Sequence, residues 1–193
     1  MAEQTFPRLV SLACHDLRTP LATVHGFAKT LLRAEQLTER TARHLGMIEE
    51  ASAEMNDLLD QLALVARIEA DRYEPELAEV DSLELAETAS GRVKAGAVDL
   101  SGEGAPLLVP AAATERAIAA FAECALRHGG LERVALDVRG RELVLSPTTV
   151  ESAPVLTSEE LRDLGAAAGR RLVEALGGAV SLEGETFVIR LPG

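Results

Sequence analysis

The sequence predicts an α+β fold, in which an N-terminal antiparallel helical hairpin is followed by an α/β sandwich domain. Two segments indicate the hairpin, because residues 8–34 and about 39–72 each carry apolar side chains at alternating steps of three and four. After residues 71–80 the pattern changes to shorter helical segments that alternate with strand-like ones, which is typical of helices layered on a sheet. We therefore expect two domains, at 1–75 and 76–193.

The first long helix has an apolar stripe and an internal proline. The stripe consists of Leu17, Leu21, Val24, Ala28 and Leu31. Pro20 lacks a backbone donor and crowds the preceding turn, so it predicts a kink in this helix. A polar connection at 34–40 follows, and Thr38 is the better candidate for the next helix cap.

The second long helix repeats the same spacing. Its stripe consists of Ile48, Ser52, Met55, Leu59, Leu62 and Ala66. Two antiparallel helices with one stripe each cannot bury both stripes alone. We therefore expect a homodimer in which two hairpins form a four-helix bundle, with folding of the hairpin back onto the rest of the chain as the alternative.

The second half of the chain predicts a mixed or antiparallel sheet with helices on one face. Helices are expected at 82–93, 113–128 and 157–176, the last with a capping box at Thr157 or Ser158. Strands are expected at 106–110, on both sides of a turn at Gly140, and in a terminal hairpin at 179–192 that turns at Gly184.

Composition excludes several classes of function. The net charge is −12 and only two of the 19 basic residues are lysines, so a nucleic-acid partner is not expected. No run of about 18 apolar residues and no signal-peptide pattern are present, which predicts a cytoplasmic protein without a membrane partner. Cys14 and Cys124 are too few for a zinc site by themselves and are expected to be reduced thiols.

One histidine stands on the outer face of the first helix. His15 lies about 160° around the helix from Leu17. Asp16 is adjacent, and Arg18 and Thr19 follow at three and four residues on the same face. A neutral imidazole is a competent nucleophile near pH 7, and a neighbouring carboxylate can fix its tautomer or accept its proton. The alternative is a solvated histidine beside a local aspartate.

The string "HDLRTPL" at 15–21 resembles the H-box of sensor histidine kinases, and residues 47–70 resemble the second helix of their dimerisation and phosphoacceptor domain. The resemblance implies that His15 carries a phosphoryl group and that Asp16 accepts a proton in a kinase reaction. It also implies that Thr19 orients water when such proteins dephosphorylate a partner.

The resemblance extends to the kinase ATP-binding domain, through residues 80–93 and 169–192, but the phosphate-handling motifs are degenerate. Ala120 and Cys124 stand where the family has asparagines, and a thiol is a poor magnesium ligand. The glycine-rich loops are also reduced, to 148–161 without a glycine and to "DLGAAAG" at 163–169. We therefore expect no bound ATP, cofactor or metal, and we interpret Cys124 as a small buried hydrophobe.

The chain thus most resembles histidine phosphotransferases that are built on a degenerate histidine-kinase core. In this interpretation His15 exchanges a phosphoryl group with the aspartate of response-regulator receiver domains, which supply Mg²⁺. The residues expected to contact the receiver are Arg18, Ala22, Thr23, Gly26 and Lys29. Small residues such as Ala22 and Gly26 are equally compatible with a merely crowded helix surface.

Two other functions remain open at this stage. One is an ATP-dependent sensor histidine kinase core or a kinase/phosphatase fragment, which the complete H-box favours and the degenerate nucleotide motifs disfavour. The other is a pseudokinase scaffold that binds a response regulator without phosphoryl transfer. Thr19 also leaves room for a phosphatase-like regulator. The sequence predicts a protein-histidine phosphotransferase without autokinase activity.

Overall fold

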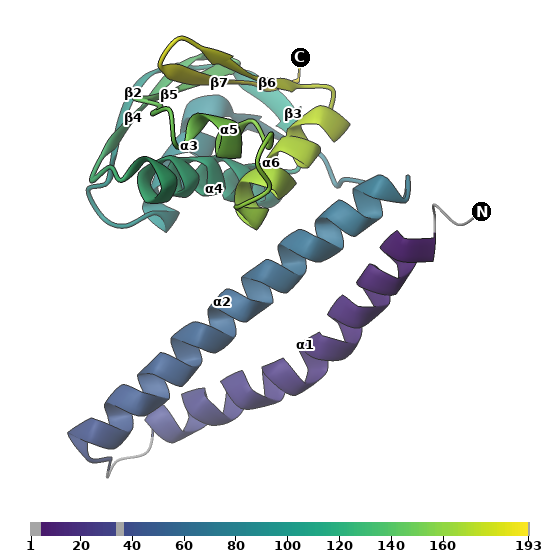
Figure 1. The fold of residues 1–193 in the computed structure, drawn as a ribbon, viewed down its shortest axis with the longest axis vertical. Helices are drawn as coiled ribbons and strands as arrows, with labels where there is room; N and C mark the ends of the chain where they lie inside the picture. Colours follow the sequence, from purple (N-terminus) through teal and green to yellow (C-terminus); the bar gives the residue numbers. More distant parts are fainter. Residues whose placement is uncertain (1–4, 34–36, 193) are drawn as a thin grey trace. The chain divides into compact units, whose positions relative to one another are not determined.

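The structure of the protein is a computed structural model that describes residues 5–33 and 37–192. The chain divides into two compact units, Met1–Arg72 and Tyr73–Gly193 (Figure 1). The first contains a pair of long helices, and the second combines β-sheets with helices. The predicted order of a helical hairpin followed by an α/β domain is therefore confirmed.

The hairpin consists of α1 (Thr5–Leu32) and α2 (Glu39–Glu69). α1 runs without interruption through Pro20, and its ribbon bends along its length, as expected where a proline removes a backbone donor (Figure 1). α2 begins as the sequence predicts, because the Thr38 hydroxyl accepts a hydrogen bond of 3.2 Å from the Thr41 amide. The predicted polar connection falls partly on residues 34–36, which lie outside the described residues.

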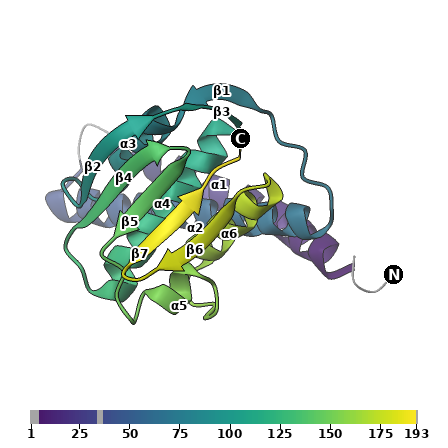
Figure 2. The same cartoon turned by 90° about the horizontal axis from the view of Figure 1, so that it is seen from above.

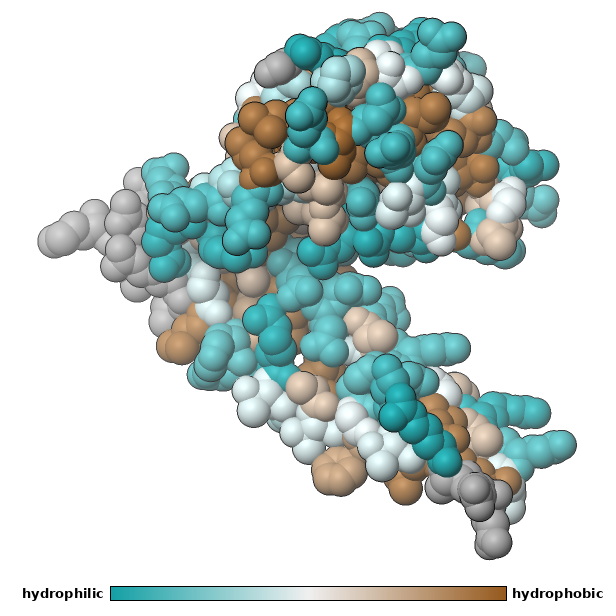
Figure 3. All heavy atoms as spheres, turned by 180° about the vertical axis from the view of Figure 1, so that it is seen from behind, coloured by the Kyte–Doolittle hydropathy of each residue, from teal (hydrophilic) through white to brown (hydrophobic). Residues whose placement is uncertain are grey.

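Each helix of the hairpin carries two neighbouring stripes with a seven-residue period. The inner stripes, which are buried or half-buried, consist of Cys14, Leu21 and Ala28 in α1 and Ser52, Leu59 and Ala66 in α2. The outer stripes, 36% to 55% exposed, consist of Leu17, Val24 and Leu31 in α1 and Ile48, Met55 and Leu62 in α2. Hydrophobic side chains are visible among hydrophilic ones along the surface of the hairpin (Figure 3). The single apolar stripe of each predicted helix is thus divided between a buried and an exposed set.

The second unit is built on a five-stranded mixed sheet. In spatial order its strands are β2 (Val98–Gly104), β4 (Val134–Gly140), β5 (Glu142–Ser146), β7 (Thr186–Arg190) and β6 (Ala179–Glu183). The β2–β4 pair is parallel and the other pairs are antiparallel. A separate antiparallel pair joins β1 (Ala78–Asp81) to β3 (Pro106–Val109). The predicted turns at Gly140 and Gly184 are confirmed, with φ of 63° and 64°.

Three helices cover one face of this sheet: α3 (Ser82–Arg92), α4 (Ala111–Gly129) and α6 (Leu164–Ala175) (Figure 2). The core between helices and sheet contains Phe121 of α4 and Phe187 of β7, with ring centroids 5.0 Å apart. α6 approaches α4 so closely that a Cβ added at Gly169 would lie 3.0 Å from the Phe121 ring. The second unit therefore has an apolar core of its own between the helices and the sheet.

The predicted helix at 157–176 is wrong in its first half. A single helical turn, α5 (Ala153–Leu156), comes earlier, and α6 begins only at Leu164. The N-cap of α6 is Asp163, whose carboxylate accepts a hydrogen bond of 3.0 Å from the Ala166 amide. Ser158 has a left-handed backbone with φ of 57°, so it cannot continue a helix, and the predicted capping box does not form.

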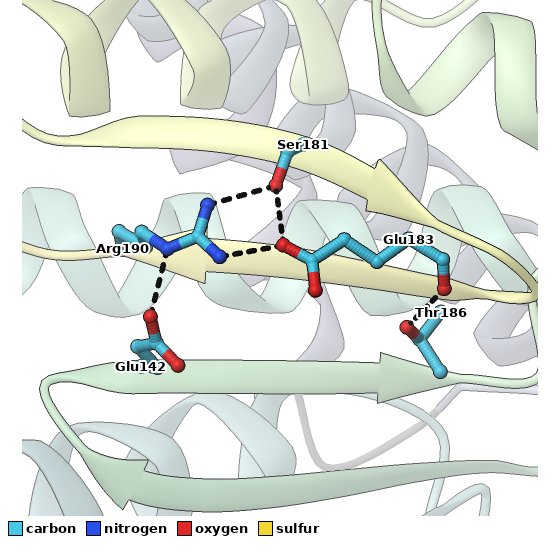
Figure 4. Close-up of polar contacts among 5 residues, drawn as sticks. All are labelled: Glu142, Ser181, Glu183, Thr186 and Arg190. Carbon is cyan, nitrogen blue, oxygen red and sulfur yellow. Dashed lines mark hydrogen bonds and ion pairs between the residues drawn. The ribbon is translucent and has the colours of Figure 1, made fainter.

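The outer face of the sheet carries a polar network centred on Arg190 of β7 (Figure 4). Its guanidinium donates to Glu142 Oε1 of β5 at 2.7 Å and to Glu183 Oε1 of β6 at 2.5 Å. It also donates to Ser181 Oγ at 3.0 Å. These bonds lower the pKa of Glu183, chiefly through the hydrogen bond from Arg190. One cation thereby links three adjacent strands.

Candidate functional site

The candidate nucleophile His15 lies on the exposed side of α1. Its side chain is 78% exposed, while the preceding residue, Cys14, is buried against the hairpin. One residue is a rotation of about 100° on a helix, so packing of Cys14 directs His15 toward solvent. The sequence prediction that this imidazole is accessible is therefore met by the geometry of the helix.

Asp16 holds one nitrogen of this imidazole. His15 Nδ1 lies 3.1 Å from Asp16 Oδ1, within hydrogen-bond distance. An ionised carboxylate can only accept, so Nδ1 carries the proton in this contact when the imidazole is neutral. The lone pair of the neutral ring is then on Nε2, the nitrogen farther from the helix. The pair presents an unprotonated, accessible nitrogen to an incoming electrophile.

The residues predicted to contact a partner follow His15 along one exposed stripe. Ala22, Gly26 and Lys29 are exposed and lie seven, eleven and fourteen residues beyond His15, and Thr19, predicted to orient water, is exposed on the same side four residues beyond it. Thr23 is also exposed, but its hydroxyl donates to the Thr19 carbonyl at 3.1 Å. The space beside Gly26 is open, since a Cβ added there would meet nothing within 4 Å.

Arg18, which the sequence predicts to contact a partner, forms an ion pair with the second helix of the hairpin. Its guanidinium donates to Asp60 Oδ1 of α2 at 2.6 Å, so it links the two helices three residues after His15. Both side chains are about half exposed, 45% and 46%. Sequence analysis did not identify Asp60, because its pairing with Arg18 depends on the register between α1 and α2. Arg18 therefore supports the hairpin beside the histidine.

In the second unit, α4 places Ala120 at intermediate exposure and Cys124 in the core. Burial, reinforced by the charge of Asp163, raises the pKa of the Cys124 thiol to about 12. These two positions therefore offer a methyl group and a protonated thiol, neither of which is an oxygen donor that suits Mg²⁺.

The segment between β5 and α6 is packed against the unit. α5 buries Val155 and Leu156, which are 1% and 0% exposed. Before it, Thr149 and Ser152 exchange hydrogen bonds, with the Thr149 amide donating to Ser152 Oγ at 3.0 Å and the Ser152 amide donating to Thr149 Oγ1 at 3.2 Å. Arg170 of α6 donates to the Thr157 carbonyl. α5 is therefore part of the core, whereas Val150 before it and Leu161 after it are 88% and 81% exposed.

Among the described residues, one cluster has the side chains and spacing of a metal site. Cys124, His128 and Asp163 each offer one ligand atom, and these atoms lie within 4.8 Å of one another. Cys124 and His128 are four residues apart on α4, but Asp163 is distant in the sequence, so sequence analysis did not identify the cluster.

Comparison with known families and proteins identifies the hairpin. The family model described as the His Kinase A (phospho-acceptor) domain matches residues 8–71. The phosphate regulon sensor protein PhoR of Pseudomonas aeruginosa is 36% identical over 72 residues, which are 37% of this chain and 16% of that protein. The sensor protein kinase PmrB of the same organism is 32% identical over 92 residues, 48% of this chain and 19% of that protein. The chain thus spans less than a fifth of the length of these relatives.

Solved structures extend the likeness to the fold of the whole chain. Full-length ShkA in complex with AMPPNP aligns with a TM-score of 0.65 and 24% identity, covering 95% of this chain and 44% of ShkA. The Acinetobacter baumannii histidine kinase AdeS aligns with a TM-score of 0.56 and 17% identity, covering 92% of this chain and 96% of that one. Within the described parts of the chain, no helix is long and apolar enough to cross a membrane. Residues 8–71 therefore match the His Kinase A (phospho-acceptor) domain, and the fold of the chain is similar to that of solved histidine-kinase structures.

Proposed function

We propose that this protein is a histidine phosphotransferase of a cytoplasmic phosphorelay, in which His15 exchanges a phosphoryl group with the aspartate of response-regulator receiver domains. The observation that carries the proposal is the exposed His15–Asp16 pair on a phosphoacceptor hairpin. The donor in this reaction is a phosphorylated protein, and ATP is not bound by this chain.

The transfer step uses the free nitrogen of His15. Nε2 attacks the phosphorus of the receiver's aspartyl phosphate in line, an N–P bond forms, and the P–O bond to the aspartate breaks. The aspartate leaves as a carboxylate. The proton on Nδ1 stays in the contact with Asp16, whose negative charge stabilises the positive charge that develops on the ring. The reverse step returns the group to a second receiver.

The features of the second unit favour a phosphorylated protein, and not ATP, as the phosphoryl donor. Nucleotide phosphates need a bound metal and clustered backbone donors. Here α4 offers Ala120 and the buried Cys124, and α5 packs Val155 and Leu156 into the core between β5 and α6. A receiver domain would supply Mg²⁺ and an acidic pocket itself, so this chain needs neither.

The receiver is expected to dock on the exposed stripe that follows His15. Ala22 and Gly26 allow close approach of a partner helix, and Lys29 adds a positive charge at the far end of the stripe. Arg18, which is paired with Asp60, supports this surface from its edge. Thr19, one turn after His15, is placed to contact the transferred group.

The active form is a homodimer through the hairpin. The six outer-stripe side chains, Leu17, Val24, Leu31, Ile48, Met55 and Leu62, form apolar surface on both helices that one hairpin does not cover. Domains of this family dimerise, and a second hairpin would complete a four-helix bundle. His15 lies outside both stripes, so dimerisation leaves it accessible.

Two labelling reactions test the proposal. The protein is incubated with a receiver domain carrying ³²P on its aspartate, and separately with labelled ATP and Mg²⁺. We expect label from the receiver alone, in an acid-labile and alkali-stable form, as an N–P bond requires. His15→Gln should reduce the label to background, while His44→Gln, at an exposed histidine of α2, should leave it unchanged.

Each other outcome contradicts the proposal in its own way. Label from ATP that is lost in His15→Gln would identify a kinase core. Tight receiver binding without label from either donor would identify a scaffold. Faster loss of phosphate from the receiver, with no label on His15, would identify a phosphatase, and Thr19→Ala would then slow that loss.

A further inference from the structure

The second unit contains a cluster of three metal-ligating side chains that phosphoryl transfer by His15 does not use. Cys124 and His128 lie four residues apart on α4, hence on one face of the helix. Asp163 is the N-cap of α6 and meets them from a second element. Cys124 is fully buried, and the side chains of His128 and Asp163 are 14% and 7% exposed.

The distances suit a small cation. His128 Nε2 lies 3.3 Å from Asp163 Oδ2, and the three ligand atoms are all within 4.8 Å of one another. Bonds of about 2.0–2.2 Å in a tetrahedral site place two ligand atoms roughly 3.3–3.6 Å apart. The distance between His128 Nε2 and Asp163 Oδ2 therefore already matches that of a tetrahedral site. The Cys124 sulfur needs at most a small side-chain adjustment.

A second observation points to a ligand between these groups. His128 Nε2 is buried and makes no hydrogen bond, although a carboxylate oxygen lies close to it. A buried nitrogen without a hydrogen bond is costly, and a shared cation would satisfy it. Asp163 Oδ1 accepts a hydrogen bond from the Ala166 amide, and Oδ2 accepts one of 3.4 Å from Arg127 Nη1. The Arg127 side chain is 65% exposed and can move into solvent, which leaves Oδ2 for a metal.

We propose that Cys124, His128 and Asp163 bind a zinc ion that joins the C-terminal end of α4 to the start of α6. A thiolate, an imidazole and a carboxylate are ligands that Zn²⁺ takes together in a tetrahedral site, whereas Mg²⁺ prefers oxygen alone. With three protein ligands, a water molecule completes the coordination. On binding, a Zn–S bond forms as the Cys124 S–H bond breaks, and that proton is released to solvent.

The role of this ion is structural. α4 and α6 already pack closely at Gly169 and Phe121, and the ion would link the same two helices at one end. The site lies in the second unit and does not depend on the chemistry of His15.

Cobalt binding tests this site directly. The full chain, free of any affinity tag, is stripped with a chelator, dialysed and titrated with Co²⁺, then with Zn²⁺ in competition. We expect one Co²⁺ per chain, visible d–d bands of tetrahedral strength and a near-ultraviolet thiolate-to-cobalt charge-transfer band, all removed by one equivalent of Zn²⁺. Zn²⁺ should also raise the melting temperature of the second unit.

Matched variants assign the ligands. Cys124→Ala should abolish the charge-transfer band, and Cys14→Ala, at the other buried cysteine, should leave it unchanged. Asp163→Asn keeps an N-cap side chain and so preserves the fold, yet should weaken Co²⁺ binding at least tenfold and abolish the thermal shift by Zn²⁺. No charge-transfer band in the wild-type protein, a band lost in Cys14→Ala, or undiminished affinity in Asp163→Asn would each overturn the proposal.

Discussion

The hairpin and the second unit differ in how they bury apolar surface. In the hairpin, six outer-stripe side chains, Leu17, Val24, Leu31, Ile48, Met55 and Leu62, remain at least one-third exposed. In the second unit, Phe121, Phe187 and Leu172 are at most 1% exposed and pack between helices and sheet. The second unit therefore has a core of its own, while the hairpin leaves part of its apolar surface uncovered.

This difference separates the two roles of the chain. The proposed phosphoacceptor, His15, belongs to the unit that leaves surface open, where a partner can reach it. The second unit instead buries Val155, Leu156 and Cys124 in its core. We therefore expect substitutions in the hairpin to affect dimer affinity, and substitutions in the second unit to affect its own free energy of unfolding.

Charged side chains in the outer stripes should prevent two hairpins from forming a dimer. Val24→Glu combined with Met55→Glu places carboxylates in the apolar contact of both protomers, and the desolvation of each costs several kcal/mol. We expect at least about a thousandfold loss of dimer affinity, measured by analytical ultracentrifugation across a concentration series.

The control for this change is Ala53→Glu, which adds a carboxylate to an exposed position on the opposite side of α2. It should leave the dimer intact. A dimer that survives the double substitution would place the interface elsewhere and leave the outer stripes without a function.

A cavity in the core of the second unit should have a smaller and more local effect. Phe121 is fully buried and packs against Phe187 with the two rings tilted by 54°. Phe121→Ala removes the ring and leaves a void, so we expect the free energy of unfolding of the second unit to fall by about 3–5 kcal/mol. Urea denaturation followed by circular dichroism measures the loss, and the dimer affinity should not change. A parallel loss of dimer would mean that the two units are not independent.

Much of the fold could be predicted from local sequence patterns. The three-four spacing locates α1 and α2, and Thr38 marks the start of α2. Gly140 and Gly184 locate two turns because their left-handed conformations favour glycine. The start of α6 could not be predicted, because Thr157, Ser158 and Asp163 are all good cap residues. The left-handed backbone of Ser158 and the hydrogen bond of Asp163 are tertiary outcomes.

The candidate site likewise contains residues that the sequence reveals and contacts that only the fold reveals. His15, Asp16 and Thr19 lie within five residues, so a motif reveals them. The Arg18–Asp60 pair and the contact of Asp163 with Cys124 and His128 join elements that are far apart in the sequence. The division of each hairpin stripe into inner and outer sets is also not evident from the sequence, since both sets are mainly apolar and lie only about 40–60° apart around the helix.

The smallest expected effect concerns the polar outer face of the sheet. Arg190→Met removes the cation that links β5, β7 and β6 but keeps an apolar side chain of similar length (Figure 4). The network is largely solvent-exposed, so the melting temperature of the second unit should fall by less than it does in Phe121→Ala. Arg162→Met, which removes an equal charge from an exposed pair with Glu160, should have almost no effect.

The loss in Arg190→Met should also depend on pH. Arg190 lowers the pKa of Glu183 below its ordinary value of 4.5, so the folded state favours the ionised carboxylate. A depressed carboxyl pKa stabilises the protein above the unfolded-state pKa, and this contribution disappears as pH falls through the folded-state value. The melting temperatures of wild type and Arg190→Met should therefore differ at pH 7 and converge as the pH falls below about 4. A difference that persists unchanged into acid would show that Arg190 acts through its hydrogen bond to the neutral Ser181 hydroxyl and not through the charge of Glu183.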